Sequence, residues 1–180
     1  MTQINRDLGS FKDPDAVVLY YQDRVYRAFT DSGAKNFKSL AESRFLERLI
    51  SQSDVIASTP VSPDVAKELR EAVPEAAMFV EHPRIPFVSY CYEWPFEMLQ
   101  AAALLHLRIL RVSLESGFTL KDATPYNVQF IGPKPQLIDI ASFEPYVPGE
   151  PWSAYNEFCR LFLNPILFQA VTGIGFQQWL

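Results

Sequence analysis

Residues 118–143, FTLKDATPYNVQFIGPKPQLIDIASF, constrain the fold of this chain more than any other stretch. Two short apolar runs, residues 128–131 and 136–140, flank a loop of glycine, lysine and two prolines at residues 132–135. This pattern predicts a β-hairpin, or two short strands joined by a tight loop. Asp139 lies inside the second run, and burying its carboxylate is costly unless a cation or several donors meet it.

Two further polar residues precede the hairpin. Asp122 and Asn127 are five residues apart in the segment LKDATPYN, and Asp139 follows the second apolar run. Mg²⁺ prefers oxygen ligands, and one or two carboxylates plus substrate phosphates usually hold it. Each residue also has a structural explanation: Asp122 as a turn cap, Asn127 as a loop residue that satisfies its neighbours, and Asp139 as the partner of a base.

The order of Asp122, Asn127, hairpin and Asp139 resembles the active-site core of the protein-kinase superfamily, in particular the aminoglycoside- and choline-kinase type. The resemblance implies an α+β, two-lobed kinase-like fold, with a small β-rich lobe (residues 1–94) and a truncated, mostly helical lobe (residues 95–180). It implies that Asp122 is catalytic, that Asn127 and Asp139 are Mg²⁺ ligands, and that ATP is the cofactor. The segments LKD and DIA stand where kinases carry His-Arg-Asp and Asp-Phe-Gly.

The same resemblance predicts phosphate contacts nearer the N-terminus. Arg27 falls near the position of the phosphate-binding lysine, although arginine is not a neutral replacement for lysine. A helix expected over residues 34–50 corresponds to the kinase helix whose glutamate pairs with that lysine. Glu42 and Glu47 both qualify, and the spacing from Arg27 favours Glu47. A solvent-facing arginine and a solvated helix face are the alternatives.

Residue patterns predict the remaining elements. Runs of β-branched and aromatic residues predict strands at 16–22, at 25–29, around Val80 and at 87–92. Apolar periodicity predicts helices at 34–50, at 63–72, at Phe96–Glu115 and from Trp152 onward, the last broken or kinked at Asn164-Pro165.

The segment YEWPF, residues 92–96, resembles the kinase hinge whose main chain meets adenine. The resemblance therefore makes Glu93 a candidate cofactor-binding residue. The helix that follows, Phe96–Glu115, is apolar on nearly every face of its first four turns, which is typical of a buried helix. Its His106 is predicted to be a core histidine with satisfied hydrogen bonds, and the helix leads into the Asp122 loop, as in kinases.

Composition narrows the class of protein. The 180 residues carry a net charge of −5 and no long basic run, so we expect no nucleic-acid partner. No uninterrupted apolar run is long enough to span a bilayer, and we identify no signal peptide, so we expect no membrane partner. Cys91 and Cys159 lack CxxC spacing, which favours buried free thiols. Together these features predict a cytoplasmic protein.

The last part of the chain is strongly apolar, with Phe168, Phe176, Trp179 and Leu180 near its end. Such a surface needs a cover, so we expect this aromatic segment to pack on a C-terminal domain or to mediate self-association. The side chains expected to be buried, partly against another chain, are Trp152, Tyr155, Phe162 and Trp179.

A second resemblance covers nearly the whole chain. The ordered segments SFKDP, VYR, PFVSYCYEW, LKDATPYNVQF and LIDIASFE resemble the N-terminal region of a bacterial family of SAM-dependent methyltransferases. A glycine-rich strand–turn–helix for the methyl donor does not occur in this sequence.

Three functional hypotheses follow, and the sequence leaves open whether the chain is an enzyme. The first is an ATP- and Mg²⁺-dependent phosphotransferase acting on an unknown acceptor. The second is a catalytically silent kinase-like module, binding a nucleotide or a partner, that accompanies a SAM-dependent methyltransferase domain absent from this chain. The third is an α+β partner-binding domain.

Overall fold

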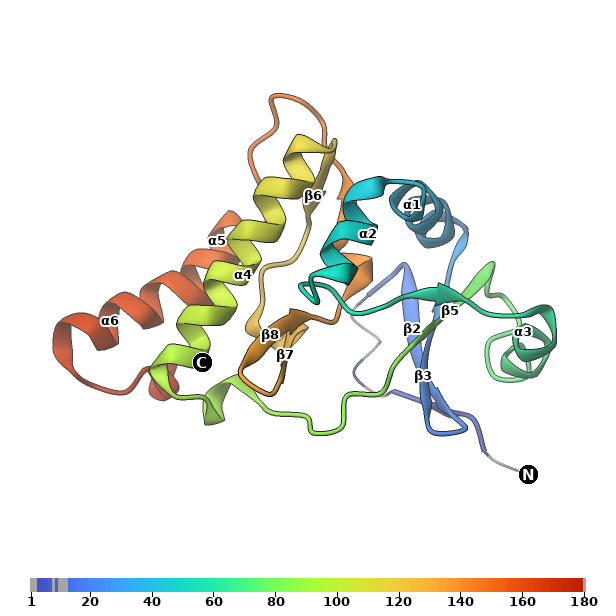
Figure 1. Cartoon of the computed structure of the whole chain (residues 1–180), viewed down its shortest axis with the longest axis horizontal. Helices are drawn as coiled ribbons and strands as arrows, with labels where there is room; N and C mark the ends of the chain where they lie inside the picture. The colour runs from blue at the N-terminus through green and yellow to red at the C-terminus, as the bar shows by residue number, and fades with distance from the viewer. Residues whose placement is uncertain (1–2, 8, 10–12, 180) are drawn as a thin grey trace. The chain divides into compact units, whose positions relative to one another are not determined.

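The computed structural model describes residues 3–7, 9 and 13–179. The chain forms two compact units, and each is assembled from two separate stretches of sequence (Figure 1). The first unit comprises Met1–Glu42 and Ile56–Arg84, and the second comprises Ser43–Val55 and Ile85–Leu180. The fold is therefore mixed α and β, and each unit is described separately below.

The first unit is built on a five-stranded antiparallel sheet with strand order β1-β2-β3-β5-β4. Its strands are β1 (Asn5–Arg6), β2 (Ala16–Tyr21), β3 (Arg24–Phe29), β4 (Thr59–Pro60) and β5 (Met78–His82). Its helices are α1 (Asp31–Ala41) and α3 (Pro63–Leu69). The predicted strands at 16–22, at 25–29 and around Val80 are confirmed, and the predicted helix at 63–72 forms but ends at Leu69.

The core of the first unit lies where the sheet meets α3. Leu19 of β2, Tyr26 of β3 and Phe79 of β5 pack with Leu69 of α3. Strands β2 and β3 are joined by Gln22 and Asp23, which have positive φ values of 47° and 62°. Two such residues are what a tight hairpin turn needs to match the twist of its strands.

The helix predicted over residues 34–50 is wrong as a single element, because the structure contains two helices in different units. Helix α1 ends at Ala41, and α2 (Arg44–Ser51) begins after Ser43, whose backbone is extended. In one continuous helix, the buried stripe of α2 would be rotated by roughly 130° from that of α1, at 100° per residue. The break at Ser43, a residue type that favours helix N-caps, allows both stripes to be buried.

The second unit contains most of the described helices and two short two-stranded antiparallel sheets, β6–β9 and the hairpin β7–β8. Its strands are β6 (Phe118–Leu120), β7 (Val128–Ile131), β8 (Lys134–Leu137) and β9 (Phe143–Pro145). Its α-helices are α2, α4 (Phe96–Glu115), α5 (Tyr155–Phe158) and α6 (Asn164–Thr172). Single turns of 3₁₀ helix are η2 (Cys91–Glu93), η3 (Pro125–Asn127), η4 (Ile140–Ser142) and η6 (Phe176–Trp179).

Both the hairpin and the long helix are confirmed. Helix α4 has the predicted bounds, and the β7–β8 turn consists of Gly132 and Pro133, with Gly132 at φ +59°. Strand β8 ends at Leu137, before the end of the second apolar run at residue 140. Asp139 therefore lies beyond the strand, where it caps η4. Residue Val55, after α2, forms a parallel bridge with Leu137, so the chain beyond α2 lies alongside β8.

The strand predicted at 87–92 is wrong. The segment is irregular and ends in η2, and the side chain of Phe87 is 76% exposed. Residue Pro86 has no N–H to donate to a strand ladder. The main chain of Ser89 forms hydrogen bonds with the side chain of Gln129 and not with a neighbouring strand.

The helix predicted from Trp152 starts at Tyr155 and runs through a π-helical turn, η5 (Cys159–Leu163), into α6. At Asn164-Pro165, where a break or kink was predicted, the helix continues, and the wider turn lies directly before Pro165, whose ring would clash with a carbonyl four residues earlier in a regular α-helix. Phe162 is buried as predicted, Trp152 is half-buried, and Tyr155 is 58% exposed within the single chain, so its burial against another chain stays a prediction. The side chain of Trp179 and residue Leu180 lie outside the described part.

Of the helices that the structure describes, none combines the length and the apolar character that a membrane crossing requires.

Candidate functional site

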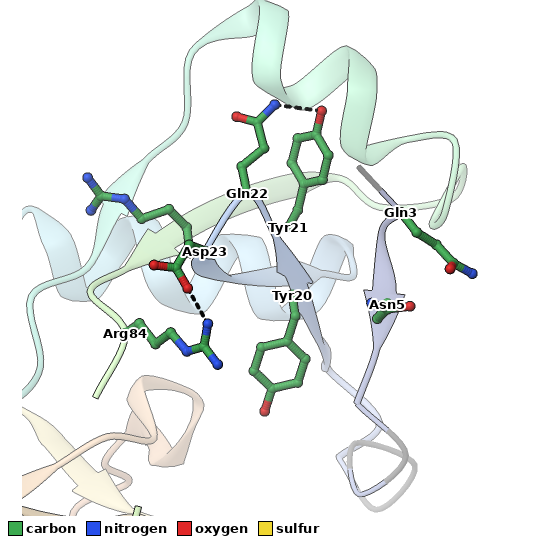
Figure 2. A pocket seen from close by; sticks show the side chains of 8 residues that line it. Gln3, Asn5, Tyr20, Tyr21, Gln22, Asp23 and Arg84 are labelled. Carbon is green, nitrogen blue, oxygen red and sulfur yellow. Dashed lines mark hydrogen bonds and ion pairs between the residues drawn. The ribbon is translucent and has the colours of Figure 1, made fainter. Parts of the chain in front are cut away.

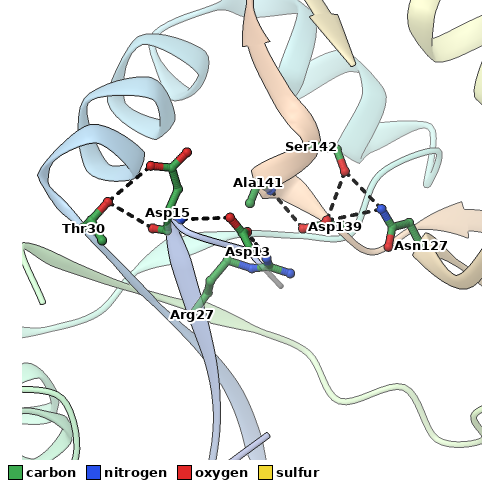
Figure 3. Close-up of polar contacts among 8 residues, drawn as sticks. All are labelled: Asp13, Asp15, Arg27, Thr30, Asn127, Asp139, Ala141 and Ser142. Carbon is green, nitrogen blue, oxygen red and sulfur yellow. Dashed lines mark hydrogen bonds and ion pairs between the residues drawn. The ribbon is translucent and has the colours of Figure 1, made fainter. Parts of the chain in front are cut away.

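Asp139 is the centre of a polar cluster in the second unit (Figure 3). Its Oδ1 accepts a hydrogen bond from the backbone N–H of Ala141 at 3.1 Å. Its Oδ2 accepts from Oγ of Ser142 at 3.0 Å and from Nδ2 of Asn127 at 3.3 Å. The amide of Asn127 also donates to Oγ of Ser142 at 3.2 Å, so the three side chains form a closed triangle. We call Asn127, Asp139 and Ser142 the Asp139 cluster.

Backbone hydrogen bonds hold this cluster in place. Ile138 donates its N–H to the carbonyl of Asn127 at 2.8 Å, which joins the end of η3 to the residue before Asp139. Lys121 donates to the carbonyl of Ser142 at 2.8 Å, which extends the β6–β9 pairing. The kinase resemblance predicted that Asn127 and Asp139 lie in one site, whereas Ser142 was not identified from the sequence. A serine three residues after a capping aspartate was the available signal.

The loop that carries Asp122 is fixed from the other side by the C-terminal segment. The Oε2 of Glu157 accepts the N–H of Ala123 at 2.7 Å. The indole Nε1 of Trp152 donates to the carbonyl of Leu120 at 2.7 Å. Asp122 itself is half-buried. Neither Glu157 nor Trp152 was singled out as a loop contact from the sequence, because each is more than thirty residues from its partner.

In this arrangement the donors and acceptors of the Asp139 cluster are hydrogen-bonded to one another, whereas Mg²⁺ would take oxygen ligands in a near-octahedral shell. Asn127 presents its N–H donors to Asp139 and Ser142, and both carboxylate oxygens of Asp139 accept from protein donors. A partly buried carboxylate is tolerated when a cation or several hydrogen-bond donors meet it. For Asp139, donors of the chain itself fill this role.

Hydrogen bonds from side chains engage the main chain at Ser89, just before the segment that resembles a kinase hinge, and at Trp94 within it. Gln129 of β7 accepts the N–H of Ser89 at 2.9 Å and donates to its carbonyl at 3.0 Å. The indole of Trp94 donates to Oγ of the same serine at 2.9 Å, and Gln177 donates to the carbonyl of Trp94 at 2.8 Å. Gln129 thus takes the place of a neighbouring strand.

Glu93, the predicted cofactor-binding residue of this segment, closes a local turn. Its carboxylate accepts the N–H of Tyr90 at 3.1 Å, and its own N–H donates to the carbonyl of Tyr90 at 2.8 Å. Trp94 donates its N–H to the carbonyl of Cys91. From Ser89 to Trp94, several main-chain groups that could meet a ligand are thus engaged within the chain.

In the first unit, Arg27 lies on β3 and forms an ion pair with Asp13, with 3.8 Å between Nη1 and Oδ2 (Figure 3). The arginine side chain is only 11% exposed. Asp13 also accepts the N–H of Asp15 through Oδ1 at 2.9 Å, so the turn before β2 presents this carboxylate to the arginine. Glu47, the predicted partner of Arg27, is an exposed residue of α2 in the second unit.

His106, in α4, lies in an aromatic cage made by Trp152, Phe158 and Phe162, with ring centroids 5.8–6.1 Å from its own. The imidazole is fully buried, and neither ring nitrogen has a hydrogen-bond partner among the described residues. The expectation of satisfied hydrogen bonds is therefore wrong. Burial without compensation lowers the pKa of His106 from 6.5 to about 4, because the charged form would lose its hydration.

A pocket of about 270 Å³ opens at the β2–β3 turn of the first unit (Figure 2). Its lining includes two tyrosines and an ion pair between Arg84 and Asp23. The lining residues are Gln3, Asn5, Tyr20, Tyr21, Gln22, Asp23, Arg24 and Arg84. None of the site residues predicted from the sequence belongs to it.

No protein-family model matches the chain. Nodulation protein NoeA of Rhizobium meliloti (strain 1021) is 36% identical to it over 174 residues. The similarity covers 97% of this chain, which includes nearly all of both units, and the chain spans 36% of the length of that relative. The chain is thus similar to about one third of a longer bacterial protein named for nodulation.

Proposed function

We propose that this chain is a catalytically silent, kinase-like module that supports another domain, in line with the SAM-dependent methyltransferase family that its sequence resembles. The observation that carries the proposal is the Asp139 cluster. Three donors from Asn127, Ala141 and Ser142 meet the carboxylate that the kinase resemblance assigns to the metal. A side chain engaged in this way is a structural element that needs no ligand.

The order of elements in the second unit supports the kinase-like part of the proposal. Helix α4 leads through β6 into the Asp122 loop, and the β7–β8 hairpin separates Asn127 from Asp139. This is the order that the resemblance implies for the core of a kinase. Strand β9 pairs with β6, which brings the chain after Asp139 back to the start of the loop.

The hinge-like segment supports the silent part. Adenine recognition by a hinge depends on main-chain donors and acceptors. Within residues 92–96, the N–H of Glu93 donates to the carbonyl of Tyr90, the N–H of Trp94 donates to the carbonyl of Cys91, and the carbonyl of Trp94 accepts from Gln177. A purine would have to displace these bonds to pair with the same main-chain groups.

One observation favours a second candidate function, Mg²⁺-dependent phosphoryl transfer. The amide of Asn127 and the carboxylate of Asp139 are in contact at 3.3 Å, the pair of residues that the kinase resemblance assigns to Mg²⁺. In this alternative, Asp122 would orient the acceptor hydroxyl. Asp139 is a structural acceptor in the first candidate function and a Mg²⁺ ligand in the second. A substitution of Asp139 therefore distinguishes the two.

Thermal unfolding of the parent and of Asp139→Asn, with and without MgATP, tests the proposal. We expect MgATP to leave the parent unchanged, and we expect Asp139→Asn to lower the stability without ligand by about 1–2 kcal/mol, because one acceptor oxygen is replaced by a donor. Glu75→Gln, at an exposed glutamate outside the helices, is the control and should change little. The proposal is wrong if MgATP raises the melting temperature of the parent in a concentration-dependent manner and Asp139→Asn abolishes that rise.

A further inference from the structure

One continuous stretch of chain, residues 152–162, fastens the Asp122 loop. Trp152, at the start of this stretch, donates its indole N–H to the carbonyl of Leu120 at 2.7 Å. Glu157, in its middle, accepts the N–H of Ala123 at 2.7 Å. These two hydrogen bonds hold the main chain on both sides of Asp122. We call residues 152–162 the strap.

The strap has little regular structure of its own to keep it in place. Its helix α5 is four residues long, whereas an isolated helix is marginal below about 12–15 residues. Helix α5 continues into the π-helical turn η5, and turns of this kind are rare and are frequent at functional sites. The loop before the strap, residues 147–151 (Figure 1), is exposed along its whole length. The position of the strap therefore depends on its contacts with the rest of the second unit.

The aromatic contacts of the strap converge on His106 of α4. Trp152, Phe158 and Phe162 have their ring centroids 5.8–6.1 Å from that of the imidazole. They also pack on each other, with 5.6 Å between the rings of Trp152 and Phe158 and 5.3 Å between those of Phe158 and Phe162. Trp152 is itself one of the two residues that fasten the loop, and Phe158 directly follows the other, Glu157. A change at His106 can therefore reach both bonds.

The surroundings of His106 offer nothing that would compensate a positive charge on its ring. Burial alone lowers its pKa, without a contribution from any charged neighbour among the described residues. The residues three and four positions away on α4 are buried and apolar, namely Ala102, Ala103, Ile109 and Leu110. Of the ionisable residues on the elements packed against α4, Glu157 and Cys159 are half-buried. The others are exposed, namely Arg44, Glu47, Arg48, Tyr126, Lys134 and Arg160.

We propose that acid releases the strap: when His106 takes up a proton from solvent, the strap leaves α4, and the Asp122 loop loses both fastening bonds while the rest of the second unit stays folded. In the open form, water reaches the imidazolium and hydrates it, as a buried charge without a partner requires. This release is independent of the proposed function, because the strap belongs neither to the Asp139 cluster nor to the hinge-like segment.

The size of the effect follows from two protonation equilibria. The pKa of His106 is about 4 with the strap in place, and it returns to the ordinary value of 6.5 once water reaches the ring. Between these two pH values the open form binds a proton that the closed form does not, so opening becomes more favourable as the pH falls. From pH 7 to pH 5, the equilibrium constant for opening should rise about 20-fold, whatever its value at pH 7.

Native-state amide hydrogen exchange measures this opening, when it is followed for single residues by NMR and corrected for the intrinsic exchange rate at each pH. We expect the N–H of Ala123 to exchange about 20-fold faster at pH 5 than at pH 7. Low concentrations of urea should change this rate little, because release of a short strap exposes little surface. The reference is Leu137, whose N–H donates to the carbonyl of Asp54 at 2.9 Å in the same unit. Its free energy of opening should be higher than that of Ala123 and should fall with urea.

Substitutions identify the group that takes up the proton. His106→Leu should remove the pH dependence at Ala123, and His106→Phe, which keeps a ring in the cage, is a second variant with the same expected result. Glu157→Gln keeps an acceptor oxygen that does not titrate, so the pH dependence should persist. His82→Gln, at the other histidine of the sequence and in the first unit, is the matched control and should also retain it. Circular dichroism at pH 7 checks that each variant is folded.

Exchange at Ala123 that does not accelerate in acid overturns the proposal. So does a free energy of opening equal to that of Leu137 at every pH and urea concentration, because Ala123 would then exchange only when the whole unit unfolds. A pH dependence that survives in both His106 variants, or that disappears in Glu157→Gln, also overturns it, since another group would then control the strap.

Discussion

The Asp139 cluster and the aromatic cage of His106 both enclose a titratable side chain in the second unit, but they do so in opposite ways. Asp139 is surrounded by three donors on its two oxygens, whereas His106 is surrounded by aromatic rings and has no hydrogen-bond partner in the described part of the chain. The first environment supplies hydrogen bonds to its side chain, whereas the second supplies none and disfavours the charged form of the imidazole. The same unit therefore encloses one polar side chain with donors and another with aromatic rings.

The largest expected effect is that of lowering the pH on the free energy of unfolding. The pKa of His106 is about 4 in the folded protein and 6.5 in the unfolded chain. Between these two pH values the unfolded chain binds a proton that the folded chain does not, so stability falls as the pH falls. The loss amounts to about 3 kcal/mol from pH 6.5 to pH 4.

Urea unfolding at pH 7, 5.5 and 4.5 measures this loss. His106→Leu should flatten the pH dependence over that range and should leave the protein at least as stable at pH 7, because the unpaired imidazole nitrogens are removed. A pH dependence of the same slope in His106→Leu would show that other groups cause it.

The next test removes the carboxylate of the Asp139 cluster. Asp139→Ala leaves the donors of Ala141, Ser142 and Asn127 without their acceptor, so we expect a loss of about 2 kcal/mol in the free energy of unfolding at pH 7. Chemical denaturation gives this value directly. Glu75→Ala, an exposed acidic residue of the first unit, serves as the control. If Asp139→Ala were neutral, the cluster could not be the structural element proposed here.

A smaller effect is expected from Ser142→Ala. The hydroxyl donates to Asp139 and accepts from Asn127, but the other two bonds to the carboxylate remain. We expect a loss of about 1 kcal/mol, which the shift in denaturation midpoint measures. A double-mutant cycle with Asp139→Ala should show coupling, because the two residues share one bond network.

The smallest effect concerns Trp152, which belongs to the cage and also donates to the carbonyl of Leu120, next to the Asp122 loop. Trp152→Phe keeps an aromatic ring but removes the donor, so we expect a loss of about 0.5–1 kcal/mol. Combined with Asp139→Ala, the losses should be additive if the two regions are independent. Strong coupling between them would mean that the cage and the cluster form one network.

Some of this could be predicted from the sequence, because the signal was local. Helix α4 has a long apolar pattern followed by Gly117, and the β7–β8 turn contains a glycine that tolerates its positive φ. The contact between Asn127 and Asp139 followed from their order around this hairpin. In each case the residues that decide the structure lie within a few positions of each other.

The predictions that were wrong or missing concern residues whose partners are distant in the sequence. The segment from Phe87 to Tyr92 has β propensity but no strand partner, and Gln129, forty residues away, bonds its main chain. The boundary at Ser43 depends on which apolar stripe each helix buries, not on helix propensity. Glu157 supports the Asp122 loop from thirty-four residues away. Single-sequence patterns do not record such distant partners.

The bridge between Val55 and Leu137 has a consequence for the order in which the chain can fold. Gln136 donates to the carbonyls of Ser53 and Val55, which precede it by 83 and 81 residues. During synthesis, residues 43–55 therefore leave the ribosome long before the strand that they contact. The first unit is complete at Arg84, so it can fold before β8, which residues 53–55 contact, has been synthesised. Closing so long a loop slows folding of the second unit, and a chain shortened before β8 would lack the strand that Val55 bridges.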